Sequence, residues 1–203
     1  AFEEVPDRIE IVVRLDIDVE KADSYLRPPF LDVPYIQGPR ELLSTCWNRC
    51  ADIAKGEILM HCGDDVTFNT DGWDHAIRSA FEEVPDRIVF AYGNDLSPNF
   101  PELGTHGFVH RRWVEAVGYF VPPLFSSDWN DVWLTDVAKK IGRARPLEDV
   151  VIEHHHYTFG KAERDRTHAE REERGAVDDV VGLYNSTGDA RRRDADRLRA
   201  VMA

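Results

Sequence analysis

Apolar runs that predict strands alternate along this chain with amphipathic segments that predict helices, and this alternation constrains the fold most. Segment 40–55 has apolar side chains at helical spacing, and the apolar run 57–62 (EILMHC) follows it directly. Runs of β-branched residues at 9–15 (IEIVVRL) and 88–92 (IVFAY) predict two further buried strands. Strands that alternate with helices predict an α/β fold with a mostly parallel sheet flanked by helices.

Shorter patterns extend this order along the chain. Asp71 is a predicted cap for a helix that runs to about residue 83. The remaining predictions are a proline-rich loop at 28–39, helices at 110–117 and 128–141 that end at Gly118 and Gly142, and a strand at 150–153.

The last part of the chain is highly charged. From residue 161 onward the pattern predicts peripheral helices with a break at 185–188. We therefore expect an α/β domain over 1–160 and a charged helical C-terminal tail over 161–203, packed on the domain or on a partner. The chain has no run of about 18 apolar residues, so we expect no membrane span.

Charge and cysteine content narrow the classes of protein to consider. The 203 residues carry a formal net charge of −13, which argues against a nucleic-acid partner because duplex binders usually present a basic face. Three cysteines without framework spacing predict reduced thiols and a cytoplasmic location. Residues 1–9 (AFEEVPDRI) recur identically at 80–88, but no longer repeat surrounds them, so we predict no solenoid.

Polar residues that can carry chemistry follow several of the predicted strands. Ligands of α/β sheets bind at the carboxyl ends of strands, so these positions are candidates for a site. Asp64 and Asp65 are adjacent carboxylates that suit Mg²⁺ or Mn²⁺, although an Asp-rich turn would leave the same pattern. His154 and His156 point to the same side of a strand, where one could join the metal shell; a partly exposed strand end is the alternative.

Four blocks of sequence, the first made of three short segments, resemble in their order family 2-like glycosyltransferases of the GT-A type. WNRCA (47–51), AKGEIL (54–59) and GDD (63–65) resemble the central block of that family, which contains its metal-binding carboxylates. The others are similar to the acceptor-side segment, the acidic helix start and the late strand that ends in a metal-binding histidine; they are GFVHRRWVEAVGYF (107–120), DWNDVWL (128–134) and VIEHHH (151–156). The resemblance covers roughly residues 9–156.

The resemblance implies a Rossmann-like, nucleotide-diphospho-sugar transferase fold over 1–160. It also implies a strand and a helix before residue 9 that this sequence does not contain. The implied activity is that of a hexosyltransferase that uses a UDP-sugar by default. Its acceptor would be a glycan, a protein or a small molecule, and its cofactor Mn²⁺ or Mg²⁺.

The resemblance also assigns roles to individual residues. Asp128 would be the catalytic base, with Asp131 as second candidate; an N-cap role for Asp128 is an alternative that is compatible with catalysis. The remaining roles are nucleotide binding by Asp16, Asp18, Arg40 and Asp64, metal binding by Asp65, His154 and His156, and sugar or acceptor contacts by Trp129, His106 and His110.

Two other functions fit the same residues. A nucleotidyltransferase also needs paired carboxylates and a metal, but a Gly-rich basic loop after its first strand is not visible. A non-catalytic nucleotide- or sugar-binding module would need the pocket alone. The sequence contains no P-loop, no Gly-x-Ser-x-Gly and no Gly-x-Gly-x-x-Gly, so NTPase, serine hydrolase and dinucleotide oxidoreductase functions lack support.

Overall fold

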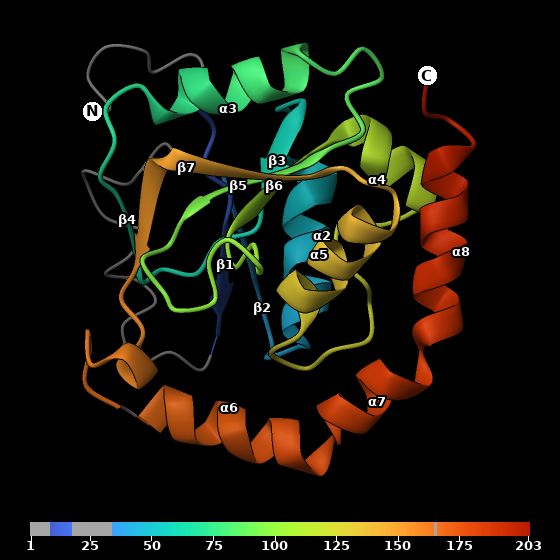
Figure 1. Cartoon of the computed structure of the whole chain (residues 1–203). Coiled ribbons are helices and arrows are strands. Elements are labelled where there is room, and N and C mark those ends of the chain that lie inside the picture. The colour runs from blue at the N-terminus through green and yellow to red at the C-terminus, as the bar shows by residue number, and fades with distance from the viewer. Residues whose placement is uncertain (1–8, 18–33, 165) are drawn as a thin grey trace.

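The structure, a computed structural model, describes residues 9–17, 34–164 and 166–203. Within these ranges the chain forms an α/β fold with a five-stranded sheet, a separate two-stranded sheet and surrounding helices (Figure 1). Asp18 and all but the last residue of the repeated segment 1–9 lie outside the described residues.

The two-stranded sheet holds the start of the described chain. Strand β1 (Val13–Asp16) pairs in parallel with β2 (Tyr35–Gly38). Helix α2 (Leu43–Ile53) follows β2 and packs beside this pair. The sequence patterns had placed Tyr35–Gly38 in a proline-rich loop, because a four-residue strand next to prolines leaves no clear period of two.

The five-stranded sheet is mixed, so the prediction of a mostly parallel sheet was wrong. Only β5 and β7 pair in parallel, and the other neighbours are antiparallel. A loop rather than a crossover helix joins β5 to β6, and such a connection permits antiparallel pairing. The order across the sheet is β3 (Ile58–Met60), β6 (Gly107–His110), β5 (Phe90–Asn94), β7 (Ala144–His154) and β4 (Val66–Phe68).

Helices cover both faces of this sheet. Successive side chains around β5 point to opposite faces and so pack against different helices. Val89 and Ala91 pack in a cluster with Ile77 and Phe81 of α3 (Trp73–Glu82). Phe90 and Tyr92 belong to the larger cluster, which contains residues of α4 (Arg111–Val117) and α5 (Asn130–Lys140).

Helix boundaries differ in detail from those predicted. Gly118 and Gly142 follow α4 and α5 with φ of 93° and 69°, the left-handed conformation that favours glycine after a helix. The predicted cap Asp71 was wrong, since Gly72 takes the cap position of α3 without a side-chain hydrogen bond. Trp129, not Asp128, takes the cap position of α5, also without a side-chain hydrogen bond.

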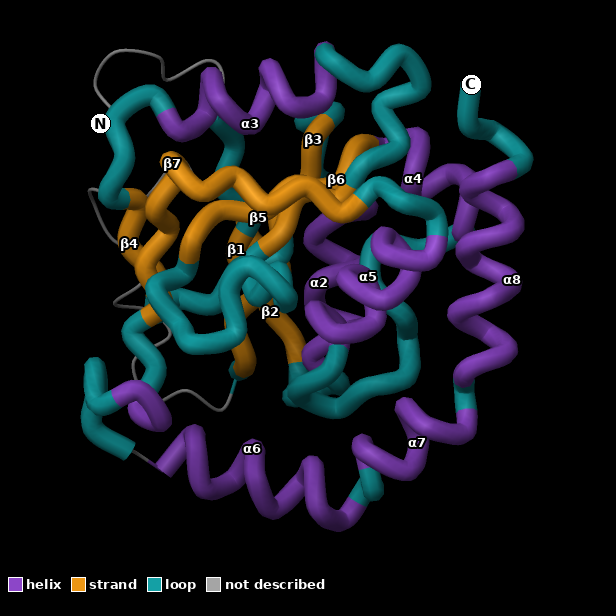
Figure 2. Tube along the Cα trace, viewed as in Figure 1, coloured by secondary structure: helices purple, strands orange, loops and turns teal. Residues whose placement is uncertain are grey.

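The charged tail forms the helices that were predicted. After a short 3₁₀ turn (Tyr157–Phe159), these helices are α6 (Arg166–Val177), α7 (Val180–Ser186) and α8 (Gly188–Arg199). Thr187 separates α7 from α8, within the predicted break. Figure 2 shows α6 crossing one end of the molecule and α8 standing against its side.

Helix α8 is part of the main core. Ala195 and Leu198 are fully buried in the cluster that also contains Trp113 and Trp133. The carboxylate of Asp194 accepts a hydrogen bond from Nε1 of Trp133 at 3.1 Å and one from the hydroxyl of Tyr119. Within the described ranges, no helix is both long and apolar enough to cross a membrane.

We predict that Leu198→Ala lowers the free energy of unfolding by about 2–5 kcal/mol, because it opens a cavity under α8. The matched control is Val201→Ala, three residues later and 53% exposed, which should change it by less than about 0.5 kcal/mol. Urea denaturation measures both variants. Equal, small effects would contradict the inclusion of α8 in the cooperative core.

Candidate metal centre

The sheet brings Asp65, His106 and His154 together from three separate segments. Met60, the last residue of β3, pairs with Phe108, near the start of β6. The residues that follow β3 and those that precede β6 therefore lie at the same end of these two strands. Val66 of β4 pairs with His154 at the end of β7, which places Asp65 beside that histidine.

Backbone and side-chain hydrogen bonds hold these segments in place. His155 donates its backbone N–H to the carbonyl of Asp65 at 2.8 Å. The backbone N–H of His154 bonds to the carbonyl of Asp95, whose buried carboxylate accepts a hydrogen bond from Thr105 at 2.9 Å. Asp95 thereby connects the end of β7 to the loop that precedes His106.

The three side chains form a compact cluster. Nε2 of His154 lies 3.0 Å from Oδ2 of Asp65, and the imidazole ring of His106 meets that of His154 edge-on with 4.6 Å between the centroids. One ligand atom from each of the three residues lies within 4.8 Å of the other two. This spacing is small enough for one ion to bind all three.

The environment sets the charge of each group. Burial opposes ionisation of Asp65, but the hydrogen bond and charge of His154 outweigh burial and hold the pKa of Asp65 below its usual value. Burial, aided by the neighbouring histidines, lowers the pKa of His106 to about 3. His106 is therefore neutral at physiological pH, which is the form of imidazole that binds metals.

The residues present fit a divalent transition metal. Both ring nitrogens of His106 are buried and have no hydrogen-bond partner within the described part of the chain, and such a group is stabilised when it gains a ligand. Two imidazoles and one carboxylate suit Mn²⁺ better than Mg²⁺, which prefers oxygen ligands.

His106 takes the place in this cluster that the sequence had suggested for His156. Nε2 of His156 faces Nη1 of Arg171 at 3.1 Å, and its Nδ1 contacts the hydroxyl of Thr158. The ring of His156 also lies beside that of His154, with 5.1 Å between the centroids, but it is His106 whose ligand atom lies within 4.8 Å of both Asp65 and His154. The sequence offered little signal for this, because His106 lies in a loop without strand periodicity.

On the predicted nucleotide side, the structure joins Asp16 to Arg40. Asp16 ends β1, and its Oδ2 lies 3.5 Å from Nε of Arg40. Arg40 also donates a hydrogen bond to Glu170 of α6 at 2.8 Å. Asp64 is exposed next to Asp65.

The two predicted base candidates lie near the start of α5 in different environments. Asp128 has a 46% exposed side chain, with Oδ1 3.6 Å from Nη1 of Arg171. Asp131 is only partly exposed, and burial, aided by the charge of Asp128, raises its pKa to about 6. His154 lies near enough for its charge to act in the opposite direction on Asp131.

Two predicted acceptor residues lie elsewhere. His110 pairs with Ile58 at the start of β3, the end of that strand opposite to Asp65. Its Nδ1 accepts a hydrogen bond from the backbone of Arg112 at 3.1 Å, so it caps α4. Trp129 packs on Tyr184 of α7 with 4.9 Å between the ring centroids. Both contacts are structural, and neither residue is brought to the metal cluster.

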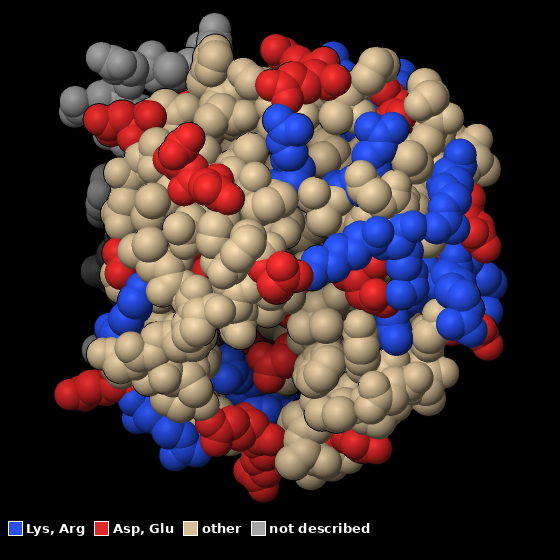
Figure 3. Space-filling model, viewed as in Figure 1, with Lys and Arg blue, Asp and Glu red and all other residues tan. Residues whose placement is uncertain are grey.

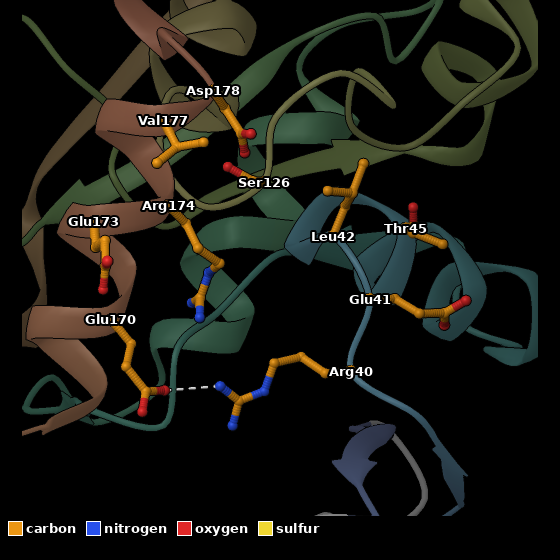
Figure 4. Close-up of a pocket in the computed structure, with 10 residues that line it drawn as sticks. All are labelled: Arg40, Glu41, Leu42, Thr45, Ser126, Glu170, Glu173, Arg174, Val177 and Asp178. Atoms are coloured by element: carbon orange, nitrogen blue, oxygen red, sulfur yellow. Dashed lines mark hydrogen bonds and ion pairs between the residues drawn. The ribbon is translucent and has the colours of Figure 1, made fainter.

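A cavity of about 820 Å³ lies between the start of α2 and α6. Figure 3 shows a recess above α6 in which basic and acidic side chains are visible. Arg40, Arg174 and Glu170 are among the residues that line the cavity (Figure 4). The metal cluster is not part of its lining.

No protein-family model and no curated protein sequence matches this chain. Assignment of the site therefore depends on its own residues and geometry.

We predict that Asp65→Asn, His106→Ala and His154→Ala each weaken Mn²⁺ binding at least about tenfold, since each removes a ligand or its charge. Isothermal titration calorimetry with Mn²⁺ measures the effect. His75→Ala, which removes an exposed histidine on α3, is the control and should leave affinity unchanged. Unchanged affinity in His106→Ala would rule out the three-residue site.

Proposed function

We propose that the chain is a metal-dependent glycosyltransferase of the GT-A type that moves a sugar from a nucleotide-diphosphate donor to an acceptor hydroxyl, with inversion. The observation that carries the proposal is the cluster of Asp65, His106 and His154, with Asp131 within electrostatic reach of it. The sheet is mixed and not mostly parallel as expected, so support for this proposal comes from the site and from the four similar blocks of sequence.

A metal bound by the cluster would neutralise the diphosphate that leaves. The residues of the chain perform the remaining tasks. Asp16 and Arg40, which are in contact, would bind the donor, with Arg40 directed to its phosphate. A carboxylate takes the proton of the acceptor hydroxyl while the oxygen of that hydroxyl bonds to the anomeric carbon. The bond from that carbon to the diphosphate oxygen breaks, and the diphosphate keeps the electron pair.

Asp131 is better suited to the role of base than Asp128. A base with a pKa close to neutral takes protons more effectively than an ordinary carboxylate, and Asp131 has a pKa of about 6. Asp128 instead forms an ion pair with the guanidinium of Arg171, whose Nη1 lies 3.6 Å from its Oδ1, so its carboxylate already has a partner. This difference reverses the order of the two candidates.

The first test is calorimetric titration of UDP with and without Mn²⁺. We expect Mn²⁺-dependent UDP binding in the native chain and none in Asp65→Ala, because the metal would link the diphosphate to the protein. The exposed His75→Ala serves as control. If neither UDP nor GDP binds with Mn²⁺ present, the nucleotide-sugar donor is excluded.

We predict that Asp131→Asn lowers kcat for UDP-sugar hydrolysis, in which water replaces the acceptor, by about 10²–10⁴-fold. UDP affinity should stay unchanged, and Asp128→Asn should have a smaller effect. The native rate should fall as the pH falls through about 6, because Asp131 is then protonated. A larger loss in Asp128→Asn would restore Asp128 as the base, and UDP binding without any hydrolysis in the native chain would favour a binding module.

A further inference from the structure

Helix α6 is attached to the domain mainly through charged and polar side chains. Glu170 bonds to Arg40 at 2.8 Å, and Glu172 accepts a hydrogen bond from the hydroxyl of Tyr157. No described side chain of α6 is fully buried, and Val177 at its end is 78% exposed. In contrast, α8 places Leu198 in the core.

The space beneath α6 is open. The cavity of about 820 Å³ separates α6 from the start of α2. In Figure 4 the side chains of Arg174 and Glu170 extend from α6 into this space, where Glu170 meets Arg40. The helix therefore spans a cavity in this region instead of packing against a surface.

Two consecutive residues of α6, Glu170 and Arg171, contact a residue proposed to bind the donor and a base candidate, respectively. Glu170 bonds to Arg40, which is itself 3.5 Å from Asp16 on the nucleotide side. Arg171 lies 3.6 Å from Asp128 and 3.1 Å from His156 on the other side. The carboxylate of Glu170 thus binds Nη1 of Arg40, while Asp16 lies beside Nε of the same guanidinium.

We propose that α6 is a removable strap over the site and that Glu170 is its anionic latch. An anion that binds at Arg40 displaces Glu170 and releases α6, which also moves Arg171 away from Asp128. The identity of that anion as a nucleoside diphosphate rests on the proposed function. The latch itself depends only on the contacts of α6.

The strength of these contacts is compatible with displacement. The side chains of Arg40 and Glu170 are 46% and 29% exposed, and ion pairs of this kind contribute little stability and are weakened by salt. A ligand that prefers the open state can then shift the population toward it. A helix held by buried apolar side chains, such as α8, would not respond in this way.

Hydrogen–deuterium exchange of the α6 amides tests the latch directly. The samples are the native chain, Glu170→Gln and the matched control Glu173→Gln, which changes a cavity-lining carboxylate of the same helix that forms no ion pair with a described residue. Each is measured alone and with inorganic pyrophosphate in metal-free buffer, so that the cluster of Asp65, His106 and His154 takes no part.

We expect Glu170→Gln to speed exchange in α6 roughly threefold to fivefold, because it weakens the exposed ion pairs of Glu170 with Arg40 and with Arg166 of the same helix. Pyrophosphate should speed it in the native chain and in Glu173→Gln, while α8 stays unchanged. Equal exchange in the native chain and Glu170→Gln would overturn the proposal. Slower exchange in α6 with pyrophosphate would also overturn it, because the helix would then close on the anion.

A titration with UDP and Mn²⁺ separates this inference from the proposed function. Faster exchange in Glu170→Gln and with pyrophosphate, without UDP binding to any variant, would support the strap and exclude the nucleotide-sugar donor. Several-fold tighter UDP binding by Glu170→Gln than by Glu173→Gln would support both.

Discussion

The hydrogen bond between Asp65 and His154 is the interaction on which the rest of the site depends. It joins the turn after β3 to the end of β7, two segments that are 89 residues apart in the chain. The antiparallel pairing of β4 with β7 makes the contact possible, and Asp95 connects the same strand end to the loop that carries His106. The mixed topology of the sheet is therefore the structural basis of the cluster.

Burial gives this cluster its chemical character. An imidazole as buried as that of His106 is held neutral, with a pKa of about 3, and its ring nitrogens have no hydrogen-bond partner in the described part of the chain. A buried polar group without a hydrogen-bond partner destabilises the folded protein unless it gains a ligand. Asp131 is affected in the opposite direction, because burial raises its pKa to about 6 and favours the protonated acid. The same physical effect thus prepares one group to bind a metal and the other to exchange a proton.

The sequence predicted the elements that apolar patterns mark, including the short strands β1 and β3, and missed three other short strands. The helices around Trp47, Ile77 and Trp133 were found, since apolar residues at helical spacing specify them locally, and so were the glycines that follow α4 and α5, Gly118 and Gly142. Strands β2, β4 and β6 have three or four residues each, too few to show a period. Asp65 and His154 were predicted as ligands from their positions after strands, whereas His106 depends on a long-range pairing that no local pattern contains. The contacts of α6 with Arg40 and Asp128 also depend on tertiary packing, which no local pattern contains.

Pulsed electron paramagnetic resonance of Mn²⁺ bound to the native chain with UDP tests the central claim most directly. The spectrum reports the nuclei around the ion. We expect ¹⁴N couplings from the two imidazoles of His106 and His154 together with ³¹P couplings from the diphosphate. Nitrogen couplings without phosphorus would leave a metal site that does not bind a nucleotide donor. A spectrum without nitrogen couplings would contradict the metal centre itself, and with it the function proposed for this chain.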